Sequence, residues 1–292
     1  MNKRKLLTLA VATAIAGTTM LWATSATSDY MHYQDGTISI CDPNDSTKCI
    51  TMQDKNLWAS EAWTWASSYW YHYQRWNNHW FLPCLESNWC ETFPWWETMT
   101  TNERVDTTNY WPQNYFDRAV FSKITSSPYD WSLTRNDNLR WWANDSQANN
   151  RWYDETNNVA INVEDRQWPC EEWYHVPSIW EWNQVLKYWA EENGIDLYGE
   201  DEKWLLYNYD WNFMQFQEDF KIPFAGTRLD NDAKVFNVGY TAYLWSSSPY
   251  VGSDNARSFY LDPIAANANI SYVRALGFSV RCFKDSYLEF PV

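Results

Sequence analysis

Glycine is scarce in this chain. The 292 residues include only eight glycines but 23 tryptophans, whereas glycine usually makes up ~7% of a protein and tryptophan is not among its common residues. Several tryptophans stand next to Asn, Asp or Ser, where a turn favours glycine because glycine reaches positive φ without a steric cost. They include Trp63 and Trp65 in EAWTWASS, Trp76 in QRWNNH, and Trp141 and Trp142 in RWWANDS. The shortage of glycine therefore suggests that some positions written as tryptophan hold glycine.

A reassigned codon would explain both numbers. Some bacterial lineages read the codon UGA as tryptophan, and others read it as glycine. We expect that this gene uses UGA for glycine, so that many positions written as tryptophan hold glycine in the native protein. The alternative is a truly tryptophan-rich protein, in which UGG codons stand at these positions.

Basic residues are also few. The chain has 22 Lys and Arg against 37 Asp and Glu, which gives a formal net charge of −15. An acidic surface repels phosphate backbones, so nucleic acid is a poor partner. The length and a hydrophobic content of 45% suit a globular chain with a sizeable core.

Sequence motifs for catalysis are missing. The chain has no GxSxG, HExxH, phosphate-binding glycine loop or dinucleotide fingerprint. It has no CxxC, and its histidines are not spaced with cysteines as zinc ligands. We therefore expect no catalytic residue, no metal and no cofactor. A cell-envelope enzyme remains an alternative, because glycoside hydrolysis needs only two carboxylates at a suitable distance. The four histidines are His32, His72, His79 and His175.

The N-terminus carries a targeting pattern. Basic MNKRK is followed by the apolar stretch LLTLAVATAIAGTTMLWA and by small residues at 23–26. This order predicts a secretory signal peptide over residues 1–26, or alternatively an uncleaved N-terminal anchor. We expect an extracellular or cell-surface protein that meets the membrane only through this segment.

Six cysteines are compatible with disulfides in an exported protein. Cys41 and Cys49 bracket one short segment, and Cys84 and Cys90 bracket another. Each of these pairs could close a short loop, which would leave Cys170 and Cys282 as a long-range pair. Sequence spacing alone does not choose among the possible pairings.

The predicted elements change character along the chain. Residues 37–52 read as two short strands around a turn, and residues 53–165 as long loops with a few short elements. Ser178 and Glu181 form a capping box, and the helix that it starts should end near 193–194.

After this helix we expect a second short helix and then strands. The expected helix covers 211–219, and the strands cover 220–229, 238–248, 256–262 and 275–285. A helix followed by an antiparallel sheet is typical of the α+β class.

The C-terminal motifs resemble a known family. CEEWYHVPSIWEW, FAGTR, WSSS and GFSVRCF follow in the order found in the Fibrobacter succinogenes major paralogous domain. That family is similar to the C-type-lectin-like fold and to the formylglycine-generating superfamily. The resemblance covers residues 50–285, with 84–165 as a divergent region; it leaves 27–49 as N-terminal strands and 286–292 as a tail. Among the matched residues are His175, Pro177, Ser178, Glu181, Trp182, Trp245, Gly277, Phe278, Arg281 and Cys282.

The resemblance implies a fold and several structural roles. The fold is a C-type-lectin-like domain with one main helix, a twisted antiparallel sheet and long loops. The family pairing implies a Cys170–Cys282 disulfide. Trp182 should lie on the buried face of the helix, with Trp245 and Phe278 packed across the sheet against it.

The resemblance also bears on the tryptophans. Trp182 and Trp245 stand where the family has tryptophan, whereas Trp58 and Trp173 stand where it tends to have glycine. A reassigned codon predicts such a mixture.

Together these features predict an exported, non-catalytic binding or adhesion module, whose partner is a surface glycan or an envelope or host-cell protein. The alternative is a carbohydrate-binding protein with an aromatic platform at Trp70, Tyr71, Tyr73 and Trp76. Calcium is a weak candidate ligand at Asp230 and Asp232, where an Asx-rich turn is the simpler interpretation.

Overall fold

The computed structural model describes residues 30–57, 59, 62, 72–74, 99–104, 120–133, 169–195, 205–207, 213–250 and 255–285. Its elements are β strands in several sheets, one long helix and one short helix, so the α+β class is confirmed. The expected signal peptide or anchor over 1–26 lies outside the described residues. In the described ranges, no helix is both long enough and apolar enough to cross a membrane.

The first sheet joins the two ends of the described chain. Its strand order is β1-β2-β3-β15-β7, and neighbouring strands in it run antiparallel. The predicted pair of strands around the Cys41–Cys49 turn is confirmed as β2 and β3. The strands are β1 (Met31–Gln34), β2 (Thr37–Asp42), β3 (Asp45–Gln53), β7 (Tyr174–His175) and β15 (Phe283–Lys284).

The remaining strands form two four-stranded sheets and a parallel pair. One sheet has the order β11-β12-β13-β8 and another the order β10-β9-β14-β4. The first of these comprises β8 (Leu205–Tyr207), β11 (Ala242–Pro249), β12 (Asn255–Leu261) and β13 (Ala265–Val273). The second comprises β4 (Tyr73–Gln74), β9 (Thr227–Arg228), β10 (Val235–Phe236) and β14 (Gly277–Phe278). The parallel pair is β5 (Met99–Thr101) with β6 (Val120–Ser122).

The predicted helices are both present, as α2 (Ile179–Asn193) and α3 (Phe213–Asp219). At the start of α2, Ser178 Oγ accepts the Glu181 N–H and the Glu181 carboxylate accepts the Ser178 N–H, so the capping box is confirmed. At its end, Gly194 adopts a left-handed conformation with φ 66°. These two signals fix both ends of the helix.

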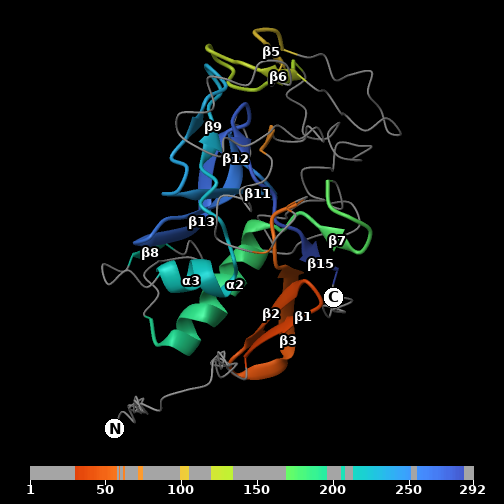
Figure 1. Ribbon diagram of the computed structural model, residues 1–292, viewed down its shortest axis with the longest axis vertical. Helices are drawn as coiled ribbons and strands as arrows, with labels where there is room; N and C mark the ends of the chain where they lie inside the picture. Colours follow the sequence, from red (N-terminus) through yellow and green to blue (C-terminus); the bar gives the residue numbers. More distant parts are fainter. Residues whose placement is uncertain are drawn as a thin grey trace, which may run out of the picture.

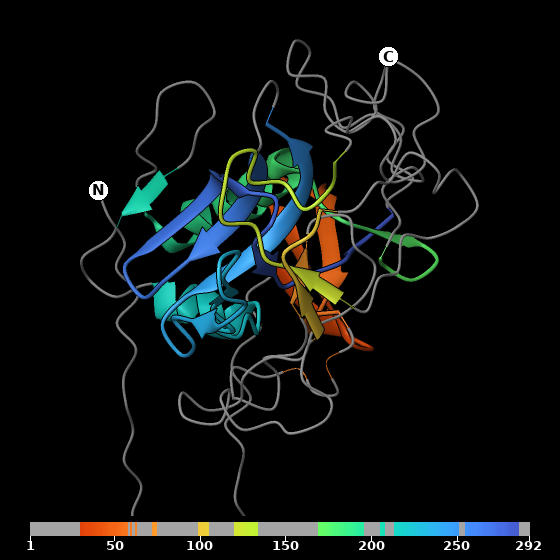
Figure 2. The same ribbon diagram turned by 90° about the horizontal axis from the view of Figure 1, so that it is seen from above.

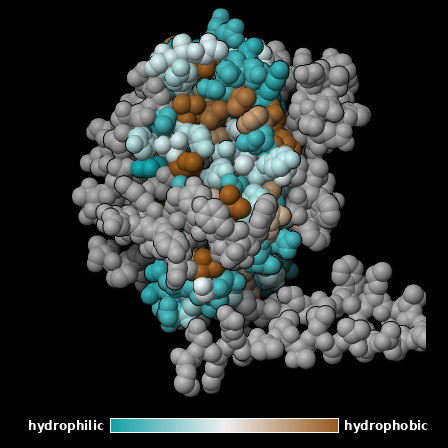
Figure 3. Space-filling model, turned by 90° about the vertical axis from the view of Figure 1, so that its left-hand side faces the viewer, coloured by the Kyte–Doolittle hydropathy of each residue, from teal (hydrophilic) through white to brown (hydrophobic). Residues whose placement is uncertain are grey.

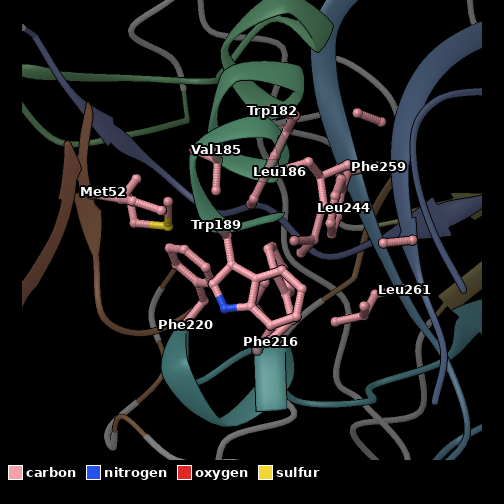
Figure 4. Packing of buried hydrophobic residues seen from close by; sticks show 14 of the residues in the cluster. Met52, Trp182, Val185, Leu186, Trp189, Phe216, Phe220, Leu244, Phe259 and Leu261 are labelled. Atoms are coloured by element: carbon pink, nitrogen blue, oxygen red, sulfur yellow. The ribbon is translucent and has the colours of Figure 1, made fainter. Parts of the chain in front are cut away.

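Helix α2 lies between the β1–β3 strands and the β11–β13 strands, and it contacts both (Figures 1 and 2). Its buried face carries Trp182, which stacks on Phe259 with ring centroids 4.3 Å apart and meets Phe283 edge-on at 4.8 Å. Trp189 packs near Phe216 at the other end of the helix (Figure 4). This cluster is the main hydrophobic core.

The expected packing of Trp245 and Phe278 against α2 is wrong. Their rings pack together with centroids 4.2 Å apart, in a second cluster that contains no residue of α2. Side chains alternate between the two faces of a strand. Leu244 of β11 faces the helix cluster, so its neighbours Tyr243 and Trp245 face the opposite side.

The expected strand over 220–229 is also largely wrong, because only β9 forms there. The carbonyls of Phe220 and Lys221 accept hydrogen bonds from the Arg281 guanidinium at 3.0 and 2.9 Å. These two carbonyls therefore bond to a side chain and not to the backbone of a neighbouring strand. The expected strand over 275–285 is divided into β14 and β15. Strand β13 was not predicted.

Two disulfides tie the described chain. Cys41–Cys49 closes eight residues between β2 and β3, and Cys170–Cys282 spans 112 residues, with Cα atoms 5.8 Å apart. Both expected pairs are confirmed. The expected Cys84–Cys90 pair lies outside the described residues.

Because a disulfide restricts the unfolded chain more when its loop is longer, the two bonds should differ in effect. We expect Cys170→Ala with Cys282→Ala to lower the free energy of unfolding by ~2–4 kcal/mol, measured by urea denaturation. The paired Cys41→Ala and Cys49→Ala variant is the control and should lose less. Equal losses would contradict the loop-length explanation.

Candidate functional site

His175 lies at the centre of a buried cluster of hydrogen-bonded side chains. Its Nε2 is 2.7 Å from Glu181 Oε1, and its Nδ1 is 2.7 Å from Asp285 Oδ1. The other Glu181 oxygen accepts from both the backbone N–H and the hydroxyl of Ser178. The cluster therefore joins β7, the start of α2 and the residue after β15. The His175 side chain is only 2% exposed, so this expected motif residue has a structural position.

Arg281, another motif residue, is fully buried and saturated with hydrogen bonds. Its guanidinium donates to Asn56 Oδ1 and to the carbonyls of Gln53, Phe220 and Lys221. Burial lowers the pKa of Arg281 to about 9. The side chain therefore stays charged at neutral pH and links three distant segments.

His72 is the second enclosed histidine. It is fully buried, and this burial, followed by the nearby Arg228 charge, lowers the pKa of His72 to about 3. The imidazole is therefore neutral at pH 7. No sequence motif singled out His72, because its burial depends on residues that are distant along the chain.

The expected aromatic platform is not available at Tyr73. This side chain is 2% exposed and belongs to the second hydrophobic cluster, so it cannot stack on a ligand. Its neighbour Gln74 is equally enclosed and bonds to Ser122 and Ala275. The other expected platform residues, at 70, 71 and 76, lie outside the described residues.

The candidate calcium residues form a turn. Asp232 Oδ1 accepts the Lys234 N–H at 3.0 Å, which is the local bond of an Asx turn. Burial raises the pKa of Asp230, whose backbone carbonyl accepts from Ile124. Across the described ranges, no group of three His, Cys, Asp or Glu side chains is placed to hold a metal.

Exposed aromatic rings occur on the segment that follows this turn. Phe236 is 56% exposed and Tyr240 is 72% exposed. Asn231, Asp232 and Lys234 are exposed on the same segment. We call these five side chains the hairpin surface. Figure 3 shows one face of the molecule, on which hydrophobic residues form separate groups among hydrophilic ones.

The backbone under the hairpin surface is held in place. Gly239 donates to the Phe224 carbonyl at 2.7 Å, and Gly226 donates to the Thr241 carbonyl at 2.9 Å. Gly226 has φ 69°, and a Cβ at this residue would lie 2.2 Å from the Phe236 carbonyl oxygen. Only glycine allows this close approach, so Gly226 fixes the position of the loop that carries both rings.

Phe236 and Tyr240 were not predicted as site residues from the sequence. The segment KVFNVGY contains a signal, because aromatic residues flank the turn-forming pair Asn237 and Gly239. Exposure of the rings depends on how the loop packs on residues 224–228, which the local sequence does not show.

No protein family, curated protein or solved structure matches the chain.

Gly226→Ala should displace the hairpin surface. The added Cβ meets backbone atoms at 2.2 and 2.9 Å, and a positive φ alone costs ~1–2 kcal/mol for a non-glycine residue. We expect a loss of at least ~3 kcal/mol in unfolding free energy, measured by urea denaturation. Gly194→Ala is the matched control, because Gly194 has φ 66° and open space around it. Equal losses in both variants would show that the close approach is unimportant.

The depressed pKa of His72 predicts acid sensitivity. In the unfolded chain His72 takes up a proton near its ordinary value of 6.5, whereas the folded protein resists protonation down to about 3. The unfolded state therefore binds more protons between these values, and stability falls as pH falls through this window.

His72→Gln, measured by urea denaturation at several pH values, should reduce this slope by ~1.4 kcal/mol per pH unit. His72→Phe serves as a second uncharged variant if glutamine does not fit the site. An unchanged slope in the folded variant would contradict the enclosed, neutral histidine.

Proposed function

We propose that this chain is an exported, non-catalytic binding module that attaches to a glycan or protein at a cell surface. The hairpin surface is its proposed contact region. The observation that carries the proposal is the pair of exposed rings, Phe236 and Tyr240, on a loop that backbone hydrogen bonds hold in place. Rigid aromatic side chains contribute large contact areas at low entropic cost, and tyrosine is enriched at binding hot spots.

Three further features support this proposal. The two disulfides suit an oxidising compartment such as the cell exterior. The C-terminal motifs resemble the Fibrobacter succinogenes major paralogous domain, which is consistent with a C-type-lectin-like architecture. The side chains of His72 and His175 are buried, so a substrate cannot reach either imidazole ring from the surface that the described residues form.

Carbohydrate is the more specific candidate ligand. Phe236 and Tyr240 are exposed aromatic side chains, and Asn231, Asp232 and Lys234 are exposed polar side chains of the same segment. A mixture of apolar faces and a few polar groups is typical of small-molecule sites. This arrangement replaces the platform expected around residue 73 as the proposed stacking surface.

A binding assay tests the hairpin surface. Labelled protein would be titrated against intact bacterial cells, peptidoglycan, cellulose and chitin. We expect saturable binding to one of them, and Phe236→Ala with Tyr240→Ala should weaken it at least tenfold, as loss of a hot spot does. Both rings are exposed, so the melting temperature should change little. Tyr240→Phe is the matched control and should retain binding through its aromatic face.

The same assay separates the two kinds of ligand. Periodate oxidation of the cell-surface sugars should abolish binding if the ligand is a glycan, whereas protease treatment should abolish it if the ligand is a protein. Binding that is unchanged in the double alanine variant would refute the hairpin surface. Absence of saturable binding to every target would refute the proposed function.

A further inference from the structure

The tryptophans that the structure describes lie in contrasting environments. Six are described, at 131, 173, 180, 182, 189 and 245. Four of these side chains are 0–2% exposed, namely Trp131, Trp182, Trp189 and Trp245, whereas Trp173 is 56% exposed. One residue type thus occupies both the centre of the core and an exposed turn.

The buried indoles make contacts that require their full size. Trp182 stacks on Phe259. Trp189 Nε1 donates to Asp219 Oδ2 at 2.8 Å, and Trp245 Nε1 donates to the Tyr73 carbonyl at 2.8 Å. Glycine at any of these positions would leave a large cavity and remove a stacked ring or a hydrogen bond, so these residues are tryptophan.

Residue 173 has the backbone of a glycine. The Tyr174 N–H donates to the Glu171 carbonyl at 3.0 Å, which fits a tight turn that includes residue 173, and Trp173 has φ 69°. A β-turn with positive φ at its third position favours glycine, because a Cβ there crowds the backbone. The Trp173 carbonyl also accepts the Asp285 N–H at 2.8 Å, so this conformation is coupled to the end of β15.

A positive φ alone does not assign glycine. Asp35 and Asn237 also have it, and their short polar side chains tolerate it. Lys221 and Ala233 have it as well, with φ 48° and 61°. Trp173 differs because a bulky aromatic ring is combined with this backbone and is left exposed, so no burial offsets the strain.

We propose that residue 173 is glycine in the protein made by its own cell, and that residues 131, 182, 189 and 245 are tryptophan. The gene then uses two codons for what is written as one residue: UGA, decoded by a glycine-charged tRNA, and UGG, decoded as tryptophan. The backbone at 173 and the burial of the side chains at the other four positions separate the two classes. This inference is independent of the proposed binding function.

Mass spectrometry of the native protein tests the proposal within one peptide. Trypsin cleaves after Arg166 and Lys187, so a single peptide of residues 167–187 contains both Trp173 and Trp182. After reduction and alkylation, fragmentation should read glycine at 173 and tryptophan at 182. Tryptophan at both positions would overturn the proposal, and glycine at both would overturn the assignment of the buried residues. The coding DNA should show UGA at 173 and UGG at 182.

Recombinant variants test the physical basis separately. Trp173→Gly should raise the melting temperature by about 2–4 °C, because relief of a strained backbone stabilises the folded state. Trp182→Gly is the matched control, and it should lower the melting temperature strongly or prevent folding. If Trp182→Gly does not fold, Trp182→Phe, which keeps a ring against Phe259, should fold with a lower melting temperature. A destabilised Trp173→Gly variant would overturn the structural argument.

Discussion

The stacking of Trp182 on Phe259, with Phe283 against its edge, is the contact on which the arrangement of the sheets depends. It joins α2 to β12 on one side and to β15 on the other. Both sheets bury apolar side chains against α2, and Phe216 of α3 adds a further contact with Phe259 of β12. Truncation of a buried tryptophan costs ~3–5 kcal/mol, which is a large share of the stability of an ordinary domain.

A second constraint follows from the pleat of β11. Ala242 and Leu244 face α2, so Tyr243 and Trp245 face the other way and form a separate core with Phe278. This second core lies next to β9 and β14, which support the loop below the hairpin surface. Strand β11 therefore packs against α2 with one face and against the second core with the other face. The sheet that carries the hairpin surface contributes Phe278 to this second core.

The sequence predicted the elements whose signals are local. The capping box at Ser178 and the glycine at 194 predicted the limits of α2, and the strand expected over 238–248 corresponds to β11 at Ala242–Pro249. Strand β13 was not expected, because its sequence AANANISYV is rich in alanine and asparagine, which are depleted in strands. It is a strand because it pairs with β12 and β8. The candidate site was missed for a similar reason, since exposure of Phe236 and burial of Tyr73 are set by distant parts of the chain.

The place of β15 in the first sheet also has a consequence for the order of folding. This strand, Phe283–Lys284, lies between β3 and β7 in the sheet, although β3 is formed by Asp45–Gln53. A ribosome releases the N-terminal strands long before the residues that bridge them to β7. The sheet therefore cannot close until Phe283–Lys284 has been made, so its closure comes late in folding. Contacts between such distant segments slow folding, so pairing of β15 with β3 and β7 should be among the slower steps in the formation of this sheet.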